Sequence, residues 1–326
     1  NKFYNYYPGR SNTFQALSLA YDPGDHIPIS IAEKDNGKLI YCNSGSLPGY
    51  GTIIELDHTT NLITKYDNTD EIIDGWDGIY IPGINSHYML VNQIEKDNLG
   101  NIWVTNPFCE KYGHLLAIQL AAYENSWVHV GIPDSSSFRP QTIALEQSGS
   151  LQRAWIGFAY DSQDHILYSS GGIKVLQYSE HTINNMTDTS WVPITNPEIL
   201  RRDGKDISIW SLAVDHMDFL WVLSEKGVQG YEVRGNNEIT LDPLSEDGEG
   251  LPYDFLTQYS FIKGSRIRVD SQNNKWIITH QGVWVIQESM AYWPSEEGLH
   301  PYNSWLLSDI VYDVAFDNDK GLAYLS

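Results

Sequence analysis

The chain has 326 residues, of which 42 are acidic and 20 basic, so its formal net charge at pH 7 is −22. A surface this acidic repels phosphate backbones and anionic lipids, which excludes nucleic acid as a partner. The sequence contains no apolar run of about 18 residues, so we expect no membrane insertion. No signal peptide opens the chain at Asn1, and we therefore expect a mature or trimmed form.

Six segments share one pattern, in which an apolar strand ends in Asp and a polar turn leads into a second apolar strand. In chain order they read DNGKLIYCNS from Asp35, DNLGNIWVTN from Asp97, DSQDHILYSS from Asp161, DHMDFLWVLS from Asp215, DSQNNKWIIT from Asp270 and DNDKGLAYLS from Asp317. Successive copies begin between 47 residues (270 to 317) and 64 residues (97 to 161) apart. A period of roughly 40–60 residues built from short strands indicates a β-propeller.

Each copy predicts an antiparallel hairpin with one face to bury. The Asp of each turn is expected to accept backbone N–H bonds and to have no catalytic role. In the five full copies an apolar residue precedes the Asp by three positions, such as Phe158 before Asp161, and in the first four of these a large one follows six positions after it, such as Leu167. The repeat tryptophans Trp103, Trp221 and Trp276 are therefore predicted to be buried between neighbouring blades.

Two weaker strands follow each hairpin, for example in 115–120 and 126–130, and complete a four-stranded antiparallel blade. The predicted fold is an all-β propeller that forms a single domain over residues 1–326, with six blades favoured and seven as the alternative. The last copy ends at Ser326 without outer strands, and an unpaired strand edge is unfavourable. Strand-like runs at 2–7 and 14–21 are predicted to supply those strands and to close the ring by joining both termini in one blade.

The clearest copies, 97–105, 215–228 and 270–283, resemble the two-component-regulator propeller repeat, and the resemblance extends over about residues 28 to 326. It implies a secreted or cell-surface bacterial propeller of the kind found in sensor ectodomains and in proteins associated with type IX secretion. The repeat residues build blades and carry no chemistry, so the resemblance implies architecture more strongly than function.

Long loops are predicted to lead into the innermost strands, at 70–90, 131–154, 196–208, 242–264 and 294–310. Such loops on a rigid scaffold commonly form binding sites. The candidate binding residues are the aromatic residues Trp76, Tyr80, Tyr88, Phe138, Tyr253, Tyr259, Tyr302 and Trp305. Their rings suit a protein or glycan partner, and the alternative is that they pack the loops onto the propeller.

The favoured function is non-enzymatic binding by a secreted, cell-surface or periplasmic protein, as a sensor or a surface-assembly module. The alternative is a polysaccharide lyase or hydrolase, although the sequence has no nucleophile elbow, zinc-protease motif or P-loop. In that alternative the acid–base candidates are His87, His280 and His300, the proton donor is Tyr88 or Tyr302, and Arg201 or Arg202 neutralises a uronate.

No cofactor is expected, with calcium as a minor alternative. Carboxylates cluster at Asp70, Glu71, Asp74 and Asp77, and again at Glu246, Asp247 and Glu249, without the EF-hand spacing. Solvated acidic loops are the favoured interpretation of both clusters. Cys42 and Cys109 follow comparable strands and could approach each other, so a disulfide stays open. The absence of a CxxC pair argues against a zinc or redox motif.

Overall fold

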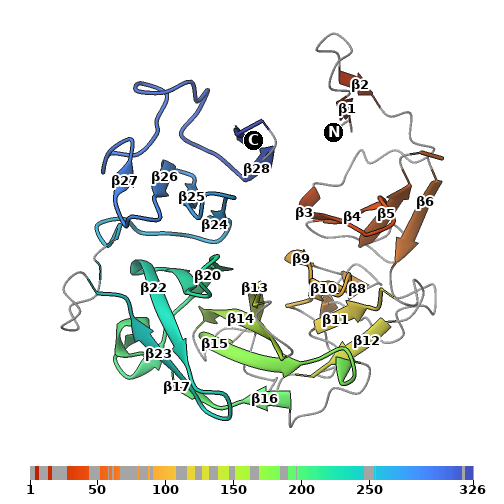
Figure 1. The fold of residues 1–326 in the computed structure, drawn as a ribbon, viewed down its shortest axis with the longest axis horizontal. Coiled ribbons are helices and arrows are strands. Elements are labelled where there is room, and N and C mark those ends of the chain that lie inside the picture. The colour runs from red at the N-terminus through yellow and green to blue at the C-terminus, as the bar shows by residue number, and fades with distance from the viewer. Residues whose placement is uncertain are drawn as a thin grey trace. The chain divides into compact units, whose positions relative to one another are not determined.

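A computed structural model gives the fold (Figure 1). It describes residues 4–6, 14–16, 28–43, 52–57, 59–60, 62–66, 79–80, 87–88, 91–107, 116–121, 127–131, 139–146, 151–161, 169–183, 190–195, 197–245, 253, 255–317 and 320–325. The chain forms two compact units, one of Asn1–Ser135 with Ile183–Asn185 and the other of Ser136–Thr182 with Met186–Ser326. Among the described residues no helix is long and apolar enough to cross a membrane.

The first unit contains two four-stranded antiparallel sheets. One consists of β3 (Pro28–Glu33), β4 (Leu39–Asn43), β5 (Ile53–Asp57) and β6 (Leu62–Tyr66), and the other of β9 (Gln93–Lys96), β10 (Ile102–Thr105), β11 (Leu116–Gln119) and β12 (Trp127–Val130). The unit also contains two small hairpins, one of β1 (Tyr4–Tyr6) with β2 (Phe14–Ala16) and one of β7 (Ile79–Tyr80) with β8 (His87–Tyr88). In each sheet the strands follow chain order, as propeller blades require.

The second unit contains three more sheets of this kind. They are β13 (Pro140–Glu146), β14 (Gln152–Asp161), β15 (Ser169–Tyr178) and β16 (Trp191–Val192); β20 (Ile209–Val214), β21 (Leu220–Ser224), β22 (Gly227–Arg234) and β23 (Ile239–Pro243); and β24 (Arg266–Val269), β25 (Lys275–Thr279), β26 (Gly282–Ile286) and β27 (Tyr292–Trp293). Smaller elements are β17 (Ile194–Thr195), which pairs in parallel with β23, the 3-10 helix Glu198–Leu200, and the hairpin of β18 (Arg201–Arg202) and β19 (Lys205–Asp206). A final pair, β28 (Val314–Asp317) and β29 (Leu322–Leu325), forms a two-stranded sheet.

Within each unit, neighbouring sheets pack through their first strands, β3 against β9 and then β13 against β20 and β20 against β24. A side-chain hydroxyl joins the two strands each time. The Ser30 hydroxyl accepts from Ile94 N at 3.0 Å, and the same device pairs Thr142 with Leu212 N at 3.2 Å and Ser211 with Ile267 N at 3.1 Å. Inner strands joined in this way are those of adjacent propeller blades. The prediction of an all-β propeller fold with four-stranded blades is confirmed.

The repeat Asp accepts turn hydrogen bonds as predicted, and it also holds the repeat Trp. Asp97 Oδ1 accepts from Leu99 N at 3.0 Å and Asn101 N at 2.8 Å, while Oδ2 accepts from the Trp103 indole at 2.9 Å. The same three bonds recur around Asp215 and Asp270. The structural role of these Asp residues is thereby confirmed, and the six-residue spacing to Trp is explained.

Burial of the repeat tryptophans follows the packing of the blades. Trp103 and Trp221 are fully buried, as predicted, but Trp276 is only half-buried. Trp276 packs beside Phe316 on β28, with ring centroids 5.6 Å apart. The prediction for Trp276 was wrong in degree because the described sheet that covers it has two strands instead of four.

The prediction that the first hairpin of the third copy turns at Asp161 is wrong by one hairpin. Asp161 ends β14 and does not lie in the first turn of its blade, which connects β13 to β14. There Glu146 Oε2 accepts from the Trp155 indole at 2.9 Å and replaces the Asp of other copies. Glu146 lies nine residues before Trp155, so the six-residue spacing does not detect it. The loop expected at 131–154 is consequently occupied in part by β13.

The prediction that Asp35 holds the turn position of the first copy is wrong by one residue. Lys34 N donates to Lys38 O at 2.9 Å, as Asp97 N donates to Asn101 O at 3.0 Å, so Lys34 holds the position of the repeat Asp. Asp35 instead faces the next blade, where its carboxylate pairs with Lys96 at 3.0 Å.

The described residues form five four-stranded blades, and the sixth repeat copy forms β28 and β29. Both N-terminal runs contain strands, and these strands pair with each other as β1 and β2. Closure of the sixth blade by this hairpin stays a prediction, as does the choice between six and seven blades.

Candidate binding surface

In the second unit, two long loops cross the end of the sheets opposite the Asp turns. Val228 and Val283 each follow the turn between the second and third strands of a blade, and they bridge to Phe255 and Leu299 in the next connecting loop. The loops that lead into β24 and β28 therefore lie over these turns. Inner-strand loops and second-strand exits thus share one end of these blades.

The 294–313 loop is pinned firmly to the blade below it. Leu299 N donates to Val283 O at 2.7 Å, Val311 N donates to Thr279 O at 3.1 Å, and the Trp284 indole donates to Glu296 O at 3.2 Å. These bonds hold both halves of the loop against β25 and β26. The loop is thus a supported surface, in which the exposed side chains extend from a fixed backbone.

His300 lies at the centre of this loop. Its Nδ1 lies 2.8 Å from Asp309 Oδ1 and its Nε2 lies 2.8 Å from Glu297 O, so both ring nitrogens are engaged within the loop. The ring stacks on Tyr302 with centroids 5.1 Å apart. A Cβ at Gly282 would lie 2.7 Å from His300 Cε1, and φ there is +127°, so close approach of the loop requires glycine at this turn. His300 therefore organises the loop.

Five large apolar side chains on this loop are exposed to solvent; they are Tyr302, Trp305, Leu307, Ile310 and Tyr312. We call them the apolar loop surface. Trp305 and Leu307 each have a relative exposure of 101%, and Tyr302 reaches 73%. Leu306 packs against a buried cluster that joins Val311 of the loop to Ile278 and Val283 of the blade. Exposed apolar side chains concentrated on one supported loop commonly mark an interaction site.

The loop is acidic as well as apolar. Residues 294–313 include Glu296, Glu297, Asp309 and Asp313 but no lysine or arginine. Asp313 pairs with Arg268, with Nη2 and Oδ2 3.0 Å apart. Burial disfavours ionisation of Asp313, but the charges of Arg268 and Arg266 outweigh it and hold the pKa of Asp313 below its usual range. Asp313 therefore anchors the loop, while Glu296 and Glu297 stay exposed.

The predicted aromatic residues divide into packed and exposed groups. Tyr253 stacks on Phe255 at 5.0 Å, and Tyr259 packs on Trp284 at 4.7 Å, so these two follow the packing alternative. Tyr302 and Trp305 are exposed, as a binding role requires. Trp76 and Phe138 lie outside the described residues, and Tyr80 and Tyr88 are described only as backbone in β7 and β8.

Sequence reasoning missed Leu307, Ile310 and Tyr312 as surface residues. The available signal was a cluster of apolar residues in a loop with neither strand nor helix periodicity, because such residues have no sheet face to occupy.

The candidate catalytic residues have different neighbours. His280 packs against Tyr312 with centroids 5.6 Å apart, whereas His300 stacks on Tyr302. Arg201 pairs with Glu198 at 3.2 Å and Asp206 at 3.3 Å, and Arg202 with Glu225 at 3.3 Å. His87 lies in β8, where its side chain is outside the description. A uronate would have to displace carboxylates that already hold both guanidinium groups.

A pocket of about 480 Å³ lies at the other end of the same unit, near the Asp270 turn. Trp276, Trp293, Phe316 and Leu322 form its apolar wall. The pocket adjoins β28 and β29, whose sheet has only two described strands.

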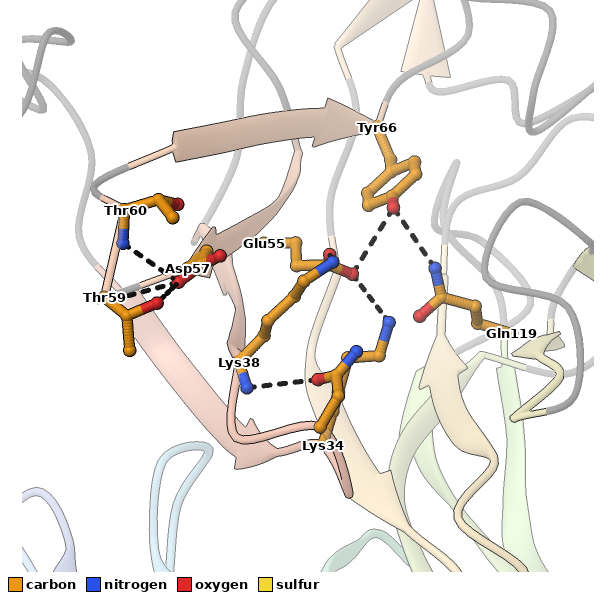
Figure 2. Close-up of polar contacts among 9 residues, drawn as sticks. Lys34, Lys38, Glu55, Asp57, Thr59, Thr60, Tyr66 and Gln119 are labelled. Carbon is orange, nitrogen blue, oxygen red and sulfur yellow. Dashed lines mark hydrogen bonds and ion pairs between the residues drawn. The ribbon is translucent and has the colours of Figure 1, made fainter.

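The first unit holds a buried polar cluster around Glu55. The Glu55 carboxylate lies 2.7 Å from Lys34 Nζ, 3.0 Å from Lys38 Nζ and 3.4 Å from the Tyr66 hydroxyl. Gln119 donates to the Tyr66 hydroxyl at 3.3 Å (Figure 2). Burial disfavours the charged form of Glu55, but the bonds to Lys34 and Lys38 lower its pKa below the usual value. Because these side chains bond to one another across strands, we interpret the cluster as a joint between strands.

No group of three metal-ligating side chains occurs in the described part of the chain. The acidic clusters at 70–77 and 246–249 lie outside that part, as does Cys109, whereas Cys42 is buried in the first blade. The calcium and disulfide alternatives stay untested expectations.

No protein-family model matches the chain, and no curated protein matches it. Among solved structures, PorZ, a surface component of the type-IX secretion system of Porphyromonas gingivalis, matches with 19% identity and a TM-score of 0.58, covering 92% of this chain and 37% of PorZ. The extracellular domain of BT4673 from B. thetaiotaomicron matches with 14% identity and a TM-score of 0.54, covering 93% of this chain and 36% of that one.

A gluconolactonase from Xanthomonas campestris has a TM-score of only 0.43 at 13% identity, with 78% of this chain and 70% of that chain covered, and does not inform function. The chain spans little more than a third of the PorZ and BT4673 structures. It shares its fold with part of each of them, in agreement with the resemblance of its repeats to the two-component-regulator propeller family.

Proposed function

We propose that the chain is a non-enzymatic binding domain that acts outside the cell or in the periplasm. Its partner is a protein or a glycan, which it contacts through the apolar loop surface, as a sensor or a surface-assembly module. The observation that carries the proposal is the full exposure of Trp305 and Leu307 on a loop held by backbone bonds. Exposing such side chains to water is unfavourable unless a partner covers them.

The fold neighbours support the location. PorZ is a bacterial surface component, and the BT4673 domain is extracellular. At 19% and 14% identity they carry no information about the partner. Location is tested by fractionating cells that produce the natural protein, and recovery from the cytosol alone would overturn this part of the proposal.

Binding is tested by probing glycan and protein arrays with wild type and Trp305→Ala in parallel. We expect at least one bound partner to be weakened by about 2 kcal/mol or more, the usual effect of removing a central aromatic anchor. Melting should be unchanged because Trp305 contributes no buried surface. Binding of every partner with unchanged affinity would refute the role of this surface.

The lyase or hydrolase alternative draws on His280, whose ring packs against Tyr312 with centroids 5.6 Å apart. An absorbance screen for unsaturated uronate products tests a lyase. Product formation that disappears in His280→Ala, with folding intact, would replace the binding proposal.

A further inference from the structure

We propose that the partner of the apolar loop surface is a protein whose docking segment carries lysine or arginine beside apolar side chains. This inference rests on the proposed function and narrows the partner from a protein or glycan to a cationic polypeptide. Two independent observations carry it, the shape of the surface and its charge.

The shape favours a polypeptide. Trp305 and Leu307 are exposed over their whole side chains, so they project from the loop and do not line a hollow. Sugar sites are concave, with polar groups converging on the ligand. Here two polar groups of the loop, His300 and Asp309, bond to each other at 2.8 Å and do not converge on a ligand site. A projecting Trp instead suits an apolar depression in another protein.

The charge of the surface defines the partner further. Residues 294–313 contain no lysine or arginine and four acidic residues, Glu296, Glu297, Asp309 and Asp313. Glu296, Glu297 and Asp309 are exposed in the loop that bears Trp305. Complementary charge steers association and suppresses wrong partners. The surface therefore favours cationic partners over uronates and phosphates.

The rigid backbone of the loop also favours binding of a flexible segment. The bonds of Leu299 and Val311 to the blade, and the ion pair of Asp313 with Arg268, fix the loop before a partner arrives. A preformed surface loses little conformational entropy on binding. A flexible basic segment can then supply the adaptation that the loop does not.

The test measures binding of defined probes to the whole chain by calorimetry. The probes are a synthetic amphipathic peptide of leucine and lysine, the same peptide with glutamate in place of lysine, and a panel of neutral glycans. One variant pair is Leu307→Ser against Leu62→Ser, since Leu62 is also exposed but lies on β6 of the first unit. The other is Glu296→Gln with Glu297→Gln against Glu238→Gln with Glu288→Gln, which changes net charge equally at exposed positions elsewhere.

We expect the lysine peptide to bind and the glutamate peptide not to bind. Leu307→Ser should weaken the lysine peptide at least about tenfold, as for an interface anchor, and Leu62→Ser should not. Neutralising Glu296 and Glu297 should weaken it several-fold more than neutralising Glu238 and Glu288, and added salt should reduce the difference.

Four results would overturn the inference. Equal effects of the two Glu→Gln pairs would mean that the peptide senses only net charge, and equal effects of Leu307→Ser and Leu62→Ser would mean that it does not bind at the apolar loop surface. Glycan binding, or binding of the glutamate peptide, that depends on Leu307 would preserve the proposed function and refute the cationic partner. Self-association abolished by Leu307→Ser would make a second copy the occupant. Failure of every probe to depend on Leu307 would count against the proposed function as well.

Discussion

The first turns of the two blades in the first unit have the same backbone and different chemistry. At Asp97 every side-chain bond closes within the hairpin itself, on Leu99, Asn101 and Trp103. At Lys34, which holds the same position, the side chain reaches Glu55 on the third strand. The comparison shows that a repeat preserves a turn more strictly than the side chain that fills it.

The two versions differ in what they connect. The Asp97 turn stabilises its own hairpin. The Glu55 cluster connects the β3–β4 turn with β5 and β6, and through Tyr66 and Gln119 it extends to β11 of the next blade. Loss of the Asp97 turn bonds should therefore destabilise only the hairpin that contains them, whereas the Glu55 cluster should couple two blades.

The largest effect is expected where the Asp turn meets its tryptophan. Trp103→Ala should lower the free energy of unfolding by about 3–5 kcal/mol because it empties a fully buried site. Trp276→Ala, at the same repeat position but half-buried, should cost less. Urea unfolding of both variants measures the difference, and equal losses would show that burial between blades does not set the cost.

Breaking the Glu55 cluster comes next. Glu55→Gln leaves Lys34 buried without its counter-charge, which should cost about 3 kcal/mol. Lys34→Met combined with Glu55→Gln should cost less than the sum of the single changes, because the two groups form one pair. A double-mutant cycle measures the coupling. Strict additivity would contradict the cluster as a joint.

Asp97→Asn should have a smaller effect of about 1–2 kcal/mol. The amide keeps one acceptor oxygen for the turn but places an N–H toward the Trp103 indole or loses the turn bonds. The matched control is Asp35→Asn, because the sequence pattern assigns Asp35 to the repeat position of the first copy. Its carboxylate is largely exposed and pairs with Lys96. A larger cost at Asp35 would reverse the assignment of the repeat position.

Acid should reduce the contribution of Glu55 to stability, which is a smaller effect than those of the substitutions above. The folded pKa of Glu55 lies below its ordinary value of 4.5. Its stabilisation is therefore present above that value and is lost as the pH falls through the folded pKa. The stability difference between wild type and Glu55→Gln should shrink on acidification below about pH 4, the range in which an ordinary Glu titrates. Denaturant midpoints at neutral and acid pH measure it, and a constant difference would argue that Glu55 is neutral in the folded chain.

The smallest effect on stability is expected on the loop. Leu307→Ser and Trp305→Ala should each change the free energy of unfolding by no more than about 0.5 kcal/mol, as surface substitutions usually do. Thermal melting measures it. A loss comparable to that of Trp103→Ala would mean that these side chains are covered within the folded protein, and the binding proposal would then lack its basis.

Much of the blade architecture is predictable from the residues alone. Alternating apolar positions and the spacing of Asp97 to Trp103 predict a hairpin, because partners six residues apart across a tight turn must meet in any such structure. The weaker strands at 116–119 and 127–130 were also predicted correctly.

Positions that depend on partners in other strands were not predictable in this way. The sequence does not indicate that Lys34 meets Glu55, that Glu146 replaces Asp in the third blade, or that Lys275 of one blade pairs with Asp215 of the next at 3.1 Å. In the loops, Tyr259 and Trp305 are both aromatic, yet one packs on Trp284 and the other is exposed.

The amino-acid sequence by itself determined the class of fold, the period of its blades and the role of the turn Asp, since these depend on contacts within a few residues of each other. The tertiary structure alone established which charges are buried together and which aromatic residues face water. Those outcomes depend on desolvation, and desolvation depends on which distant strand or loop covers a side chain. The same residue types can therefore form a buried joint at Glu55 and an open surface beside Trp305.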